Sequence, residues 1–276
     1  MQKERGHESL YPVAWALRSK PPLDPLVLCA HDRMLYAFNV KSRQFVAEIR
    51  GHGNSITSIA VEATHPSIVC TTSRDFSARI IDLDMEPRQE PNNPPMPPSK
   101  VPNLAGAPVG LQMTGREGNG FGRCLAVLAG GRAGGHQAAV MGAAFHHTFP
   151  LIATCGMDRA VKIWRLPLLS NPDVFSREDK PIFSSSRIHD ARVLSVSWLS
   201  DDVLLTHSAP ASLRRDPDDV QSLYTQDGQA IVWQWIGLHR FFPPDKGAAA
   251  WPNAARPCAS VSEGTSAVHR LSLRTA

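Results

Sequence analysis

Residues 135–166 read GHQAAVMGAAFHHTFPLIATCGMDRAVKIWRL and contain one complete copy of the unit from which this chain is built. The stretch opens on a Gly-His pair, passes through two apolar runs to Asp158, and reaches Trp164 six residues after that aspartate. In its last run Val161 and Ile163 alternate with Lys162 and Trp164, which is the period of a strand and not of a helix. The stretch therefore predicts a small antiparallel unit of β-strands joined by tight turns.

The same arrangement occurs four times along the chain. An aspartate follows a histidine and precedes, by six residues, an aromatic or aliphatic strand residue. The four sets are His7, Asp32 and Phe38; His52, Asp75 and Ile81; His136, Asp158 and Trp164; and His189, Asp227 and Trp233. A Gly-His pair, two strands, a turn aspartate and a strand that ends near Trp mark the WD40 repeat. We therefore predict an all-β fold, a WD40 β-propeller.

The repeats set the expected boundaries of the blades. We expect WD40 repeats over 1–235, with blades at about 6–50, 51–84 together with 123–134, 135–188, and 189–235. Residues 86–108 hold eight prolines in 23 positions, and proline lacks the N–H that a strand ladder needs. We therefore expect a Pro/Gly-rich insertion over 86–122 outside the sheets. We expect residues 236–276, which have no Gly-His pair and no long apolar run, to be a disordered tail.

The repeated histidines and aspartates are expected to be structural. In such a blade the histidine donates to the turn aspartate, and a hydroxyl and the indole N–H extend the network. Each buried polar group left without a partner would cost ~1–3 kcal/mol. The expected members are His52, Thr71 and Asp75; His136, Thr154, Asp158 and Trp164; and His189, Asp227 and Trp233. Blade two has Ile81 in place of tryptophan, and the position four before Asp227 is Leu223, which leaves the hydroxyl of that network open.

Other kinds of chemistry find little support in the sequence. A catalytic site occurs once, whereas these pairs recur, so we expect no enzyme. We also expect no metal, since His146 and His147 lack a ligand spacing, no cofactor, no membrane span and no sequence-specific nucleic-acid binding. The net charge of +4 arises without a cluster of lysine and arginine. Five cysteines without a CxxC pair predict reduced thiols and a reducing compartment.

Several segments go beyond a general WD40 pattern. GHGNSITSI (51–59), CGMDRAVKIWRL (155–166), IHDARVLSVSWLSDDVLL (188–205) with QAIVWQW (229–235), and LYPVAW (10–15) resemble, in the same order, segments of the extra sex combs / embryonic ectoderm development family. The resemblance covers roughly residues 10–235. It implies a seven-bladed propeller that supports a Polycomb complex methylating lysine twenty-seven of histone H3. Such proteins hold a helix of the SET-domain methyltransferase subunit and bind the trimethylated histone H3 tail in an aromatic cage.

From this resemblance we expect a nuclear, non-catalytic scaffold subunit that contributes to transcriptional repression; a general WD40 adaptor of another complex is the alternative. Tyr11 matches one tyrosine of the family's cage, although it could equally begin an inner strand. The other cage aromatics have no counterpart here, so the cage is incomplete.

Four blades of an expected seven do not close a ring of the usual size. We expect a truncated or mis-spliced gene model, with pairing to another chain and a degenerate copy as the alternatives.

Overall fold

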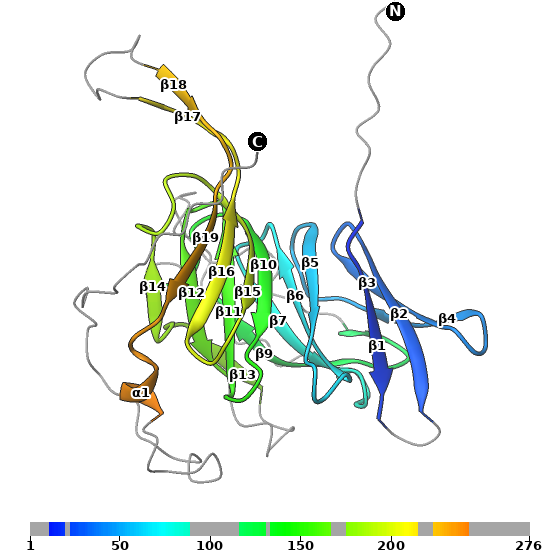
Figure 1. Cartoon of the computed structure of the whole chain (residues 1–276). Coiled ribbons are helices and arrows are strands. Elements are labelled where there is room, and N and C mark those ends of the chain that lie inside the picture. The colour runs from blue at the N-terminus through cyan, green and yellow to red at the C-terminus, as the bar shows by residue number, and fades with distance from the viewer. Residues whose placement is uncertain are drawn as a thin grey trace, which may run out of the picture.

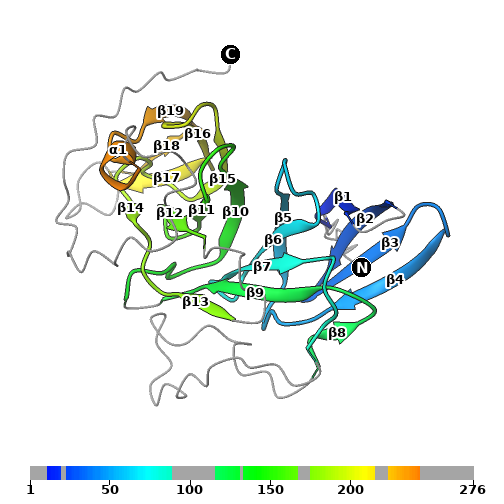
Figure 2. The same ribbon diagram turned by 90° about the horizontal axis from the view of Figure 1, so that it is seen from below.

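The computed structural model describes residues 11–19, 23–88, 116–130, 133–166, 175–214 and 223–242. Four twisted, mainly antiparallel sheets lie side by side in an arc, with the first strand of each toward the inside of the arc (Figures 1 and 2). These sheets are blades 1 to 4 in chain order. The predicted all-β, incomplete WD40 propeller is thereby confirmed.

Blade 1 contains β1 (Val13–Arg18), β2 (Asp24–His31), β3 (Met34–Asn39) and β4 (Gln44–Ile49) as an antiparallel meander. A fifth strand, β8 (Gly118–Asn119), pairs with β4. This short strand lies within 86–122, which we expected to stay outside the sheets. Gly118 makes the pairing possible, because a Cβ at this position would lie 1.9 Å from the carbonyl oxygen of Glu48. Glycine next to a proline-rich segment is typical of a loop, so the sequence does not indicate this strand.

Blade 2 contains β5 (Ile56–Val61), β6 (Ile68–Ser73), β7 (Ala78–Asp82) and β9 (Arg123–Leu128). The strand after the proline-rich segment therefore pairs with β7 and belongs to this blade. Parallel to β9 runs β13 (Ser176–Glu178), which adds an edge strand from residues assigned by sequence to the third blade. Three residues with no apolar alternation carry too little pattern to reveal such a pairing.

Blade 3 contains β10 (Val140–Phe145), β11 (Leu151–Gly156), β12 (Val161–Arg165) and β14 (Phe183–Ser185). Blade 4 has three strands in its main sheet: β15 (Val193–Trp198), β16 (Val203–Ser208) and β19 (Ala230–Gln234). The connection between β16 and β19 carries a hairpin of β17 (Ala211–Arg214) and β18 (Leu223–Gln226), which projects from the sheets (Figure 1).

The segment that follows Trp235 is folded over its first residues, which corrects part of the expected disordered tail. A short helix, α1 (Leu238–Phe241), comes after blade 4, and Leu238 and Phe242 are only 2% and 3% exposed. Phe242 packs on Phe149 of blade 3 with ring centroids 4.8 Å apart. Two apolar residues four positions apart are too few to predict a helix from the sequence. The expectation for residues 243–276 lies outside the described residues.

Three apolar clusters join the blades. The first lies between blades 1 and 2, the second between blades 2 and 3, and the third between blades 3 and 4, where α1 also packs. Burial of apolar surface stabilises a fold by ~25 cal/mol for each Å² that is buried. These clusters are therefore the main source of the stability of the fold. Over the described ranges, none of the helical structure is long and apolar enough to cross a membrane.

Candidate functional site

The best-developed polar network lies in blade 3. His136 Nδ1 is 3.0 Å from Asp158 Oδ2, and His136 Nε2 is 2.8 Å from Thr154 Oγ1. The Trp164 indole N–H donates to the same hydroxyl oxygen at 2.8 Å. A proton on His136 Nδ1 satisfies every member: the imidazole donates to the carboxylate and accepts from the hydroxyl, which accepts from the indole. The four side chains thus tie the Gly-His loop to strands β11 and β12.

Blade 2 has a shorter version of this network. His52 Nδ1 lies 2.9 Å from Asp75 Oδ2, and His52 Nε2 lies 2.8 Å from Thr71 Oγ1. Ile81 occupies the position of Trp164, so no indole donor reaches Thr71. The Ser77 hydroxyl donates to Asp75 Oδ1 at 2.6 Å and adds a local bond of its own.

Blade 4 departs from the arrangement expected from spacing. His189 Nε2 lies 2.7 Å from Thr206 Oγ1, and the Trp233 indole N–H donates to that oxygen at 3.1 Å. Asp227 is exposed at the end of the β17–β18 hairpin and is not brought to His189. The assignment of Asp227 to this network is therefore corrected. In the sequence, the hairpin lies between the end of β16 and the aspartate. The hydroxyl of the network is that of Thr206, in the run LLTHS, and the position four residues before Asp227 therefore did not identify it.

Blade 1 has a different turn. Asp32 adopts a positive φ of 50° and accepts a hydrogen bond from the Ser55 hydroxyl at 2.9 Å, which links blade 1 to blade 2. In the pairing of β2 with β3, Cys29 lies opposite Tyr36, and Tyr36 precedes Phe38 by two residues. His7 lies outside the described residues.

Ionisation in the two complete His–Asp pairs follows from burial and hydrogen bonding. Burial alone would raise the pKa of Asp75, but attraction to the His52 ring and bonds from His52, Ser77 and the Gly53 N–H lower it to about 2. The pKa of Asp158 also falls to about 2, because bonds from His136 and two backbone N–H groups outweigh burial. Burial lowers the pKa of His136. Both ring nitrogens of His52 and His136 are engaged inside the blades, which leaves them no exposed acid or base to offer a substrate.

Tyr11 lies just before β1 and is 53% exposed. Its ring centroid lies 5.2 Å from that of His31, with the planes tilted by 31°. Trp15 follows along the same inner strand and is 68% exposed. Tyr11 and Trp15 are thus exposed aromatic residues at the beginning of blade 1, and Tyr11 packs on His31.

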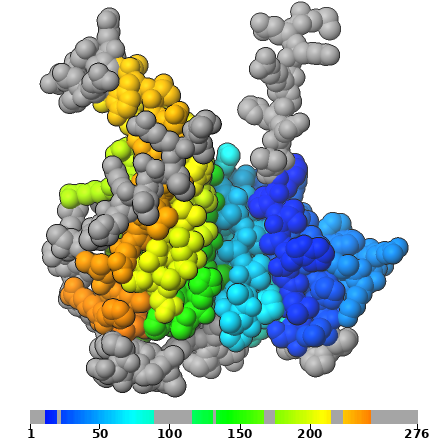
Figure 3. Space-filling model, in the orientation of Figure 1, coloured from blue at the N-terminus to red at the C-terminus, as the bar shows by residue number. Residues whose placement is uncertain are grey.

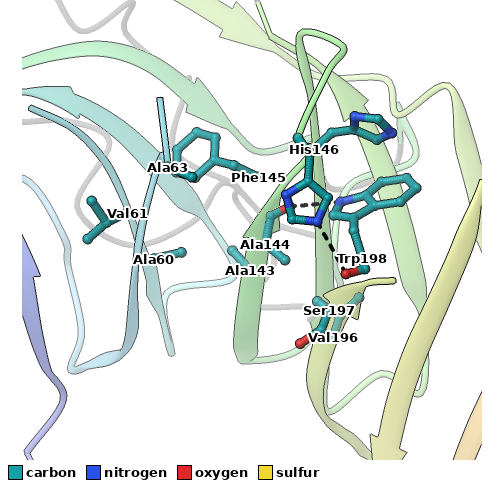
Figure 4. Close-up of a pocket in the computed structure, with 11 residues that line it drawn as sticks. Ala60, Val61, Ala63, Ala143, Ala144, Phe145, His146, Val196, Ser197 and Trp198 are labelled. Atoms are coloured by element: carbon teal, nitrogen blue, oxygen red, sulfur yellow. Dashed lines mark hydrogen bonds between the residues drawn. The ribbon is translucent and has the colours of Figure 1, made fainter. Parts of the chain in front are cut away.

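A shallow pocket of about 290 Å³ lies where the inner strands of blades 2, 3 and 4 end (Figure 4). Alanines from β5 and β10 form much of its wall, and His146 and Trp198 line its other side. His146 Nε2 donates to the Asp201 carbonyl at 2.8 Å, while its Nδ1 accepts the Thr148 N–H at 2.9 Å. The His146 ring is thus committed to joining blades 3 and 4, and the pocket is mainly apolar.

The part of the chain that the structure describes contains neither a metal-binding cluster nor a reactive thiol. No group of three or more His, Cys, Asp or Glu side chains there could hold a metal ion. Cys29, Cys70, Cys124 and Cys155 are free thiols. Burial raises the pKa of Cys124 to about 11 and raises those of Cys70 and Cys155 as well, so these thiols stay protonated and unreactive.

Comparisons with known proteins agree with the repeats. The family model described as "WD domain, G-beta repeat" matches residues 43–82 and 122–165. The chain is 25% identical over 228 residues to Polycomb group protein FIE1 of Zea mays, covering 78% of this chain and 41% of that protein. It is 25% identical over 210 residues to Polycomb protein EED of Chaetomium thermophilum, covering 73% of this chain and 30% of that protein.

The fold has the same relatives among solved structures. A chain of the Chaetomium thermophilum Polycomb Repressive Complex 2 superimposes with a TM-score of 0.60 at 20% identity, covering 94% of this chain and 46% of that chain. The fold is that of a WD40 β-propeller, as the four sheets, the His–Asp–Thr networks and the matched repeats agree. Within that class its relatives are Polycomb group proteins, and the resemblance to the extra sex combs / embryonic ectoderm development family is confirmed. The chain spans less than half of the length of these relatives.

Proposed function

We propose that this chain is a non-catalytic WD-repeat scaffold subunit of a Polycomb-type histone H3 lysine methyltransferase complex. The observation that carries the proposal is the similarity to Polycomb group proteins across about three quarters of the chain. Because the match extends over most of the chain, the similarity is not confined to one repeat.

The internal histidines support a scaffold and not a catalyst. His52 and His136 are buried and bonded at both ring nitrogens, and their aspartates also accept backbone N–H groups. A general base needs a nitrogen or oxygen within reach of a substrate proton. These pairs instead stabilise loops whose outer surfaces are available to partners, which is how rigid propellers present binding residues.

The proposed partners are a SET-domain methyltransferase subunit and the tail of histone H3, and the proposed location is the nucleus. Tyr11 is the residue of this chain proposed to contact a trimethyl-lysine, since a tyrosine face attracts a quaternary ammonium ion. Its exposure and its place at the end of the inner strand β1 are compatible with that role.

Co-purification tests the proposal. The 276-residue chain, tagged and expressed in cells of its own source, is expected to bring down a SET-domain methyltransferase in stoichiometric amount. An equally tagged and equally expressed unrelated WD40 protein is the matched control. Recovery of the chain with other partners and without a SET-domain protein would contradict the Polycomb proposal.

The same experiment addresses the alternative, a WD40 adaptor of a different complex. The exposed hairpin of β17 and β18 favours this alternative, because Leu223 and Tyr224 offer apolar side chains away from the four main sheets. A partner lost on Tyr224→Ala but retained on Tyr11→Ala would favour the adaptor.

A further inference from the structure

His146 joins a turn of blade 3 to a turn of blade 4. It lies where β10 gives way to β11, and it is only 3% exposed. Its Nε2 donates at 2.8 Å to the carbonyl oxygen of Asp201, in the turn between β15 and β16. Its ring meets the ring of Trp198 at a centroid distance of 4.5 Å and an angle of 66°. Figure 3 shows blade 4, in yellow, in direct contact with blade 3, in green.

Further hydrogen bonds hold the two blades together at this end. The Thr148 hydroxyl donates to the Asp201 carboxylate at 3.0 Å. The Trp198 indole N–H donates to the Ala144 carbonyl oxygen at 3.1 Å (Figure 4). His147 Nε2 lies 3.3 Å from the carbonyl oxygen of Trp198. We name the first group the blade 3–4 latch, which consists of His146, Thr148, Trp198 and Asp201.

The other ring nitrogen of His146 is an acceptor. The backbone N–H groups of Thr148 and Phe149 both donate to His146 Nδ1, at 2.9 Å and 3.0 Å. An imidazole nitrogen accepts a hydrogen bond only while it carries no proton. The latch therefore requires a neutral ring with its hydrogen on Nε2, because a charged ring would point an N–H at two other N–H groups.

The surroundings of His146 favour the neutral ring. Burial lowers its pKa, and this effect outweighs the attraction of Asp201, while His147 lowers the pKa further. The carboxylate of Asp202 accepts from the Gln234 amide at 2.5 Å. Blade 2 presents mainly apolar residues on this side, and its Glu62 carboxylate accepts from hydroxyl and N–H groups of its own turn.

We propose that His146 is an acid-sensitive latch: its protonation releases the turn between β15 and β16 from blade 3 and opens this end of the joint. The remainder of the joint stays closed, because the apolar cluster that includes Ile163, Val196 and Trp233 does not depend on this histidine. His146 and Trp198 also line the pocket at this end of the inner strands, so opening the latch removes part of the pocket wall.

The direction of the pH effect follows from proton linkage. In the open latch the His146 ring is exposed to water and takes up a proton below its ordinary pKa of ~6.5. In the closed latch its pKa is lower. The latch is therefore fully stable above about pH 6.5, and below that its opening equilibrium constant rises by about tenfold for each pH unit, until the pKa of the closed form is reached.

Hydrogen exchange of the whole chain, followed by mass spectrometry from about pH 7.5 to about pH 5, measures this opening segment by segment. After correction for the intrinsic pH dependence of exchange, residues 146–150 and 199–203 are expected to open increasingly as the pH falls. His146→Asn is expected to abolish that increase, because its Oδ1 can accept the two N–H groups and has no proton to gain. His147→Gln, at the exposed neighbouring position, is the matched control and is expected to keep the wild-type slope.

Each other outcome is decisive. An opening that does not change with pH in the wild type, or that keeps its slope in His146→Asn, would overturn the proposal. Loss of the slope in His147→Gln would assign the titration to the wrong histidine, and an increase shared equally by blades 1 and 2 would mean global unfolding. Circular dichroism checks folding, and His146→Gln replaces His146→Asn if the latter does not fold. The nitrogen chemical shifts of the His146 ring are an independent reading: a ring that is already charged above about pH 6.5 contradicts the latch.

Discussion

The Trp233 indole N–H donates to Thr206 Oγ1 at 3.1 Å across β16 and β19, although the β17–β18 hairpin separates these two strands in the sequence. His189 Nε2 lies 2.7 Å from the same oxygen. A single hydroxyl therefore joins three segments of blade 4. The network has survived an insertion because the insertion lies in the turn, where it does not disturb the pairing of the two strands.

Thr206→Val is expected to lower the free energy of unfolding by ~2 kcal/mol, since it leaves Trp233 and His189 short of a partner in a buried site. Thr206→Ser keeps the hydroxyl and is expected to lose much less. Urea denaturation followed by tryptophan fluorescence measures both. The control is Thr225→Val on the exposed strand β18. Equal stability of the Val variant and the wild type would contradict the role assigned to this hydroxyl.

Asp158 and Asp227 occupy matching positions in the sequence but different environments in the fold. Asp158→Ala is expected to destabilise the chain by ~3 kcal/mol, because it removes the partner of the buried His136 and the acceptor of two backbone N–H groups. Asp227→Ala, at an exposed position, is expected to change stability by less than ~0.5 kcal/mol. Thermal and urea unfolding of the two variants check the contrast, which fails if both substitutions cost the same.

The pH dependence of stability follows from the same pairs. Asp75 and Asp158 have pKa values of about 2 in the folded chain, below the ordinary value of ~3.9. Each carboxylate therefore stabilises the fold above about pH 4, by ~2 kcal/mol, and this contribution is lost as the pH falls from about 4 to 2. The lowered pKa of His136 means that the unfolded chain takes up a proton first, below about pH 6.5, so stability begins to fall there.

Urea unfolding at a series of pH values measures this profile. The wild type is expected to lose stability in two stages, a shallow one below about pH 6.5 and a steep one below about pH 4. Asp158→Asn is expected to be less stable at neutral pH and to show a smaller loss below pH 4. A rise in stability between pH 6.5 and pH 4 would contradict the sign assigned to His136.

The helix α1 provides a test of the fold beyond Trp235. Phe242→Ala is expected to cost ~3–4 kcal/mol, because the ring is buried against Phe149 and its removal leaves a cavity. Leu223→Ala, on an exposed apolar side chain, is the control and is expected to be nearly neutral. Denaturant midpoints of the two variants decide whether this segment is part of the core.

The sequence predicted most of the architecture because the repeated pairs carry their own register. His136, Asp158, Thr154 and Trp164 lie at fixed separations, and the fold brings them together at those separations. The same counting misplaced Asp227, because an inserted hairpin broke the link between sequence distance and position on the strands. The edge strands β8 and β13 were missed for another reason: two or three residues gain their structure from a neighbouring strand and not from their own pattern.

Tyr11 is the residue on which the histone-binding proposal can be tested directly. Tyr11→Ala is expected to weaken binding of a histone H3 peptide carrying trimethylated lysine twenty-seven by ~1–2 kcal/mol, or roughly 5-fold to 30-fold, since an aromatic face is lost from the cation. Tyr11→Phe keeps the ring and is expected to bind nearly as the wild type. Isothermal titration with trimethylated and unmethylated peptides separates recognition of the ammonium ion from recognition of the backbone. Tyr224→Ala, on the hairpin away from β1, is the matched control. If the chain does not distinguish the two peptides, or if Tyr11→Ala binds as the wild type does, Tyr11 is no more than the residue at which the inner strand begins, because a cage aromatic cannot be removed without cost to a bound cation.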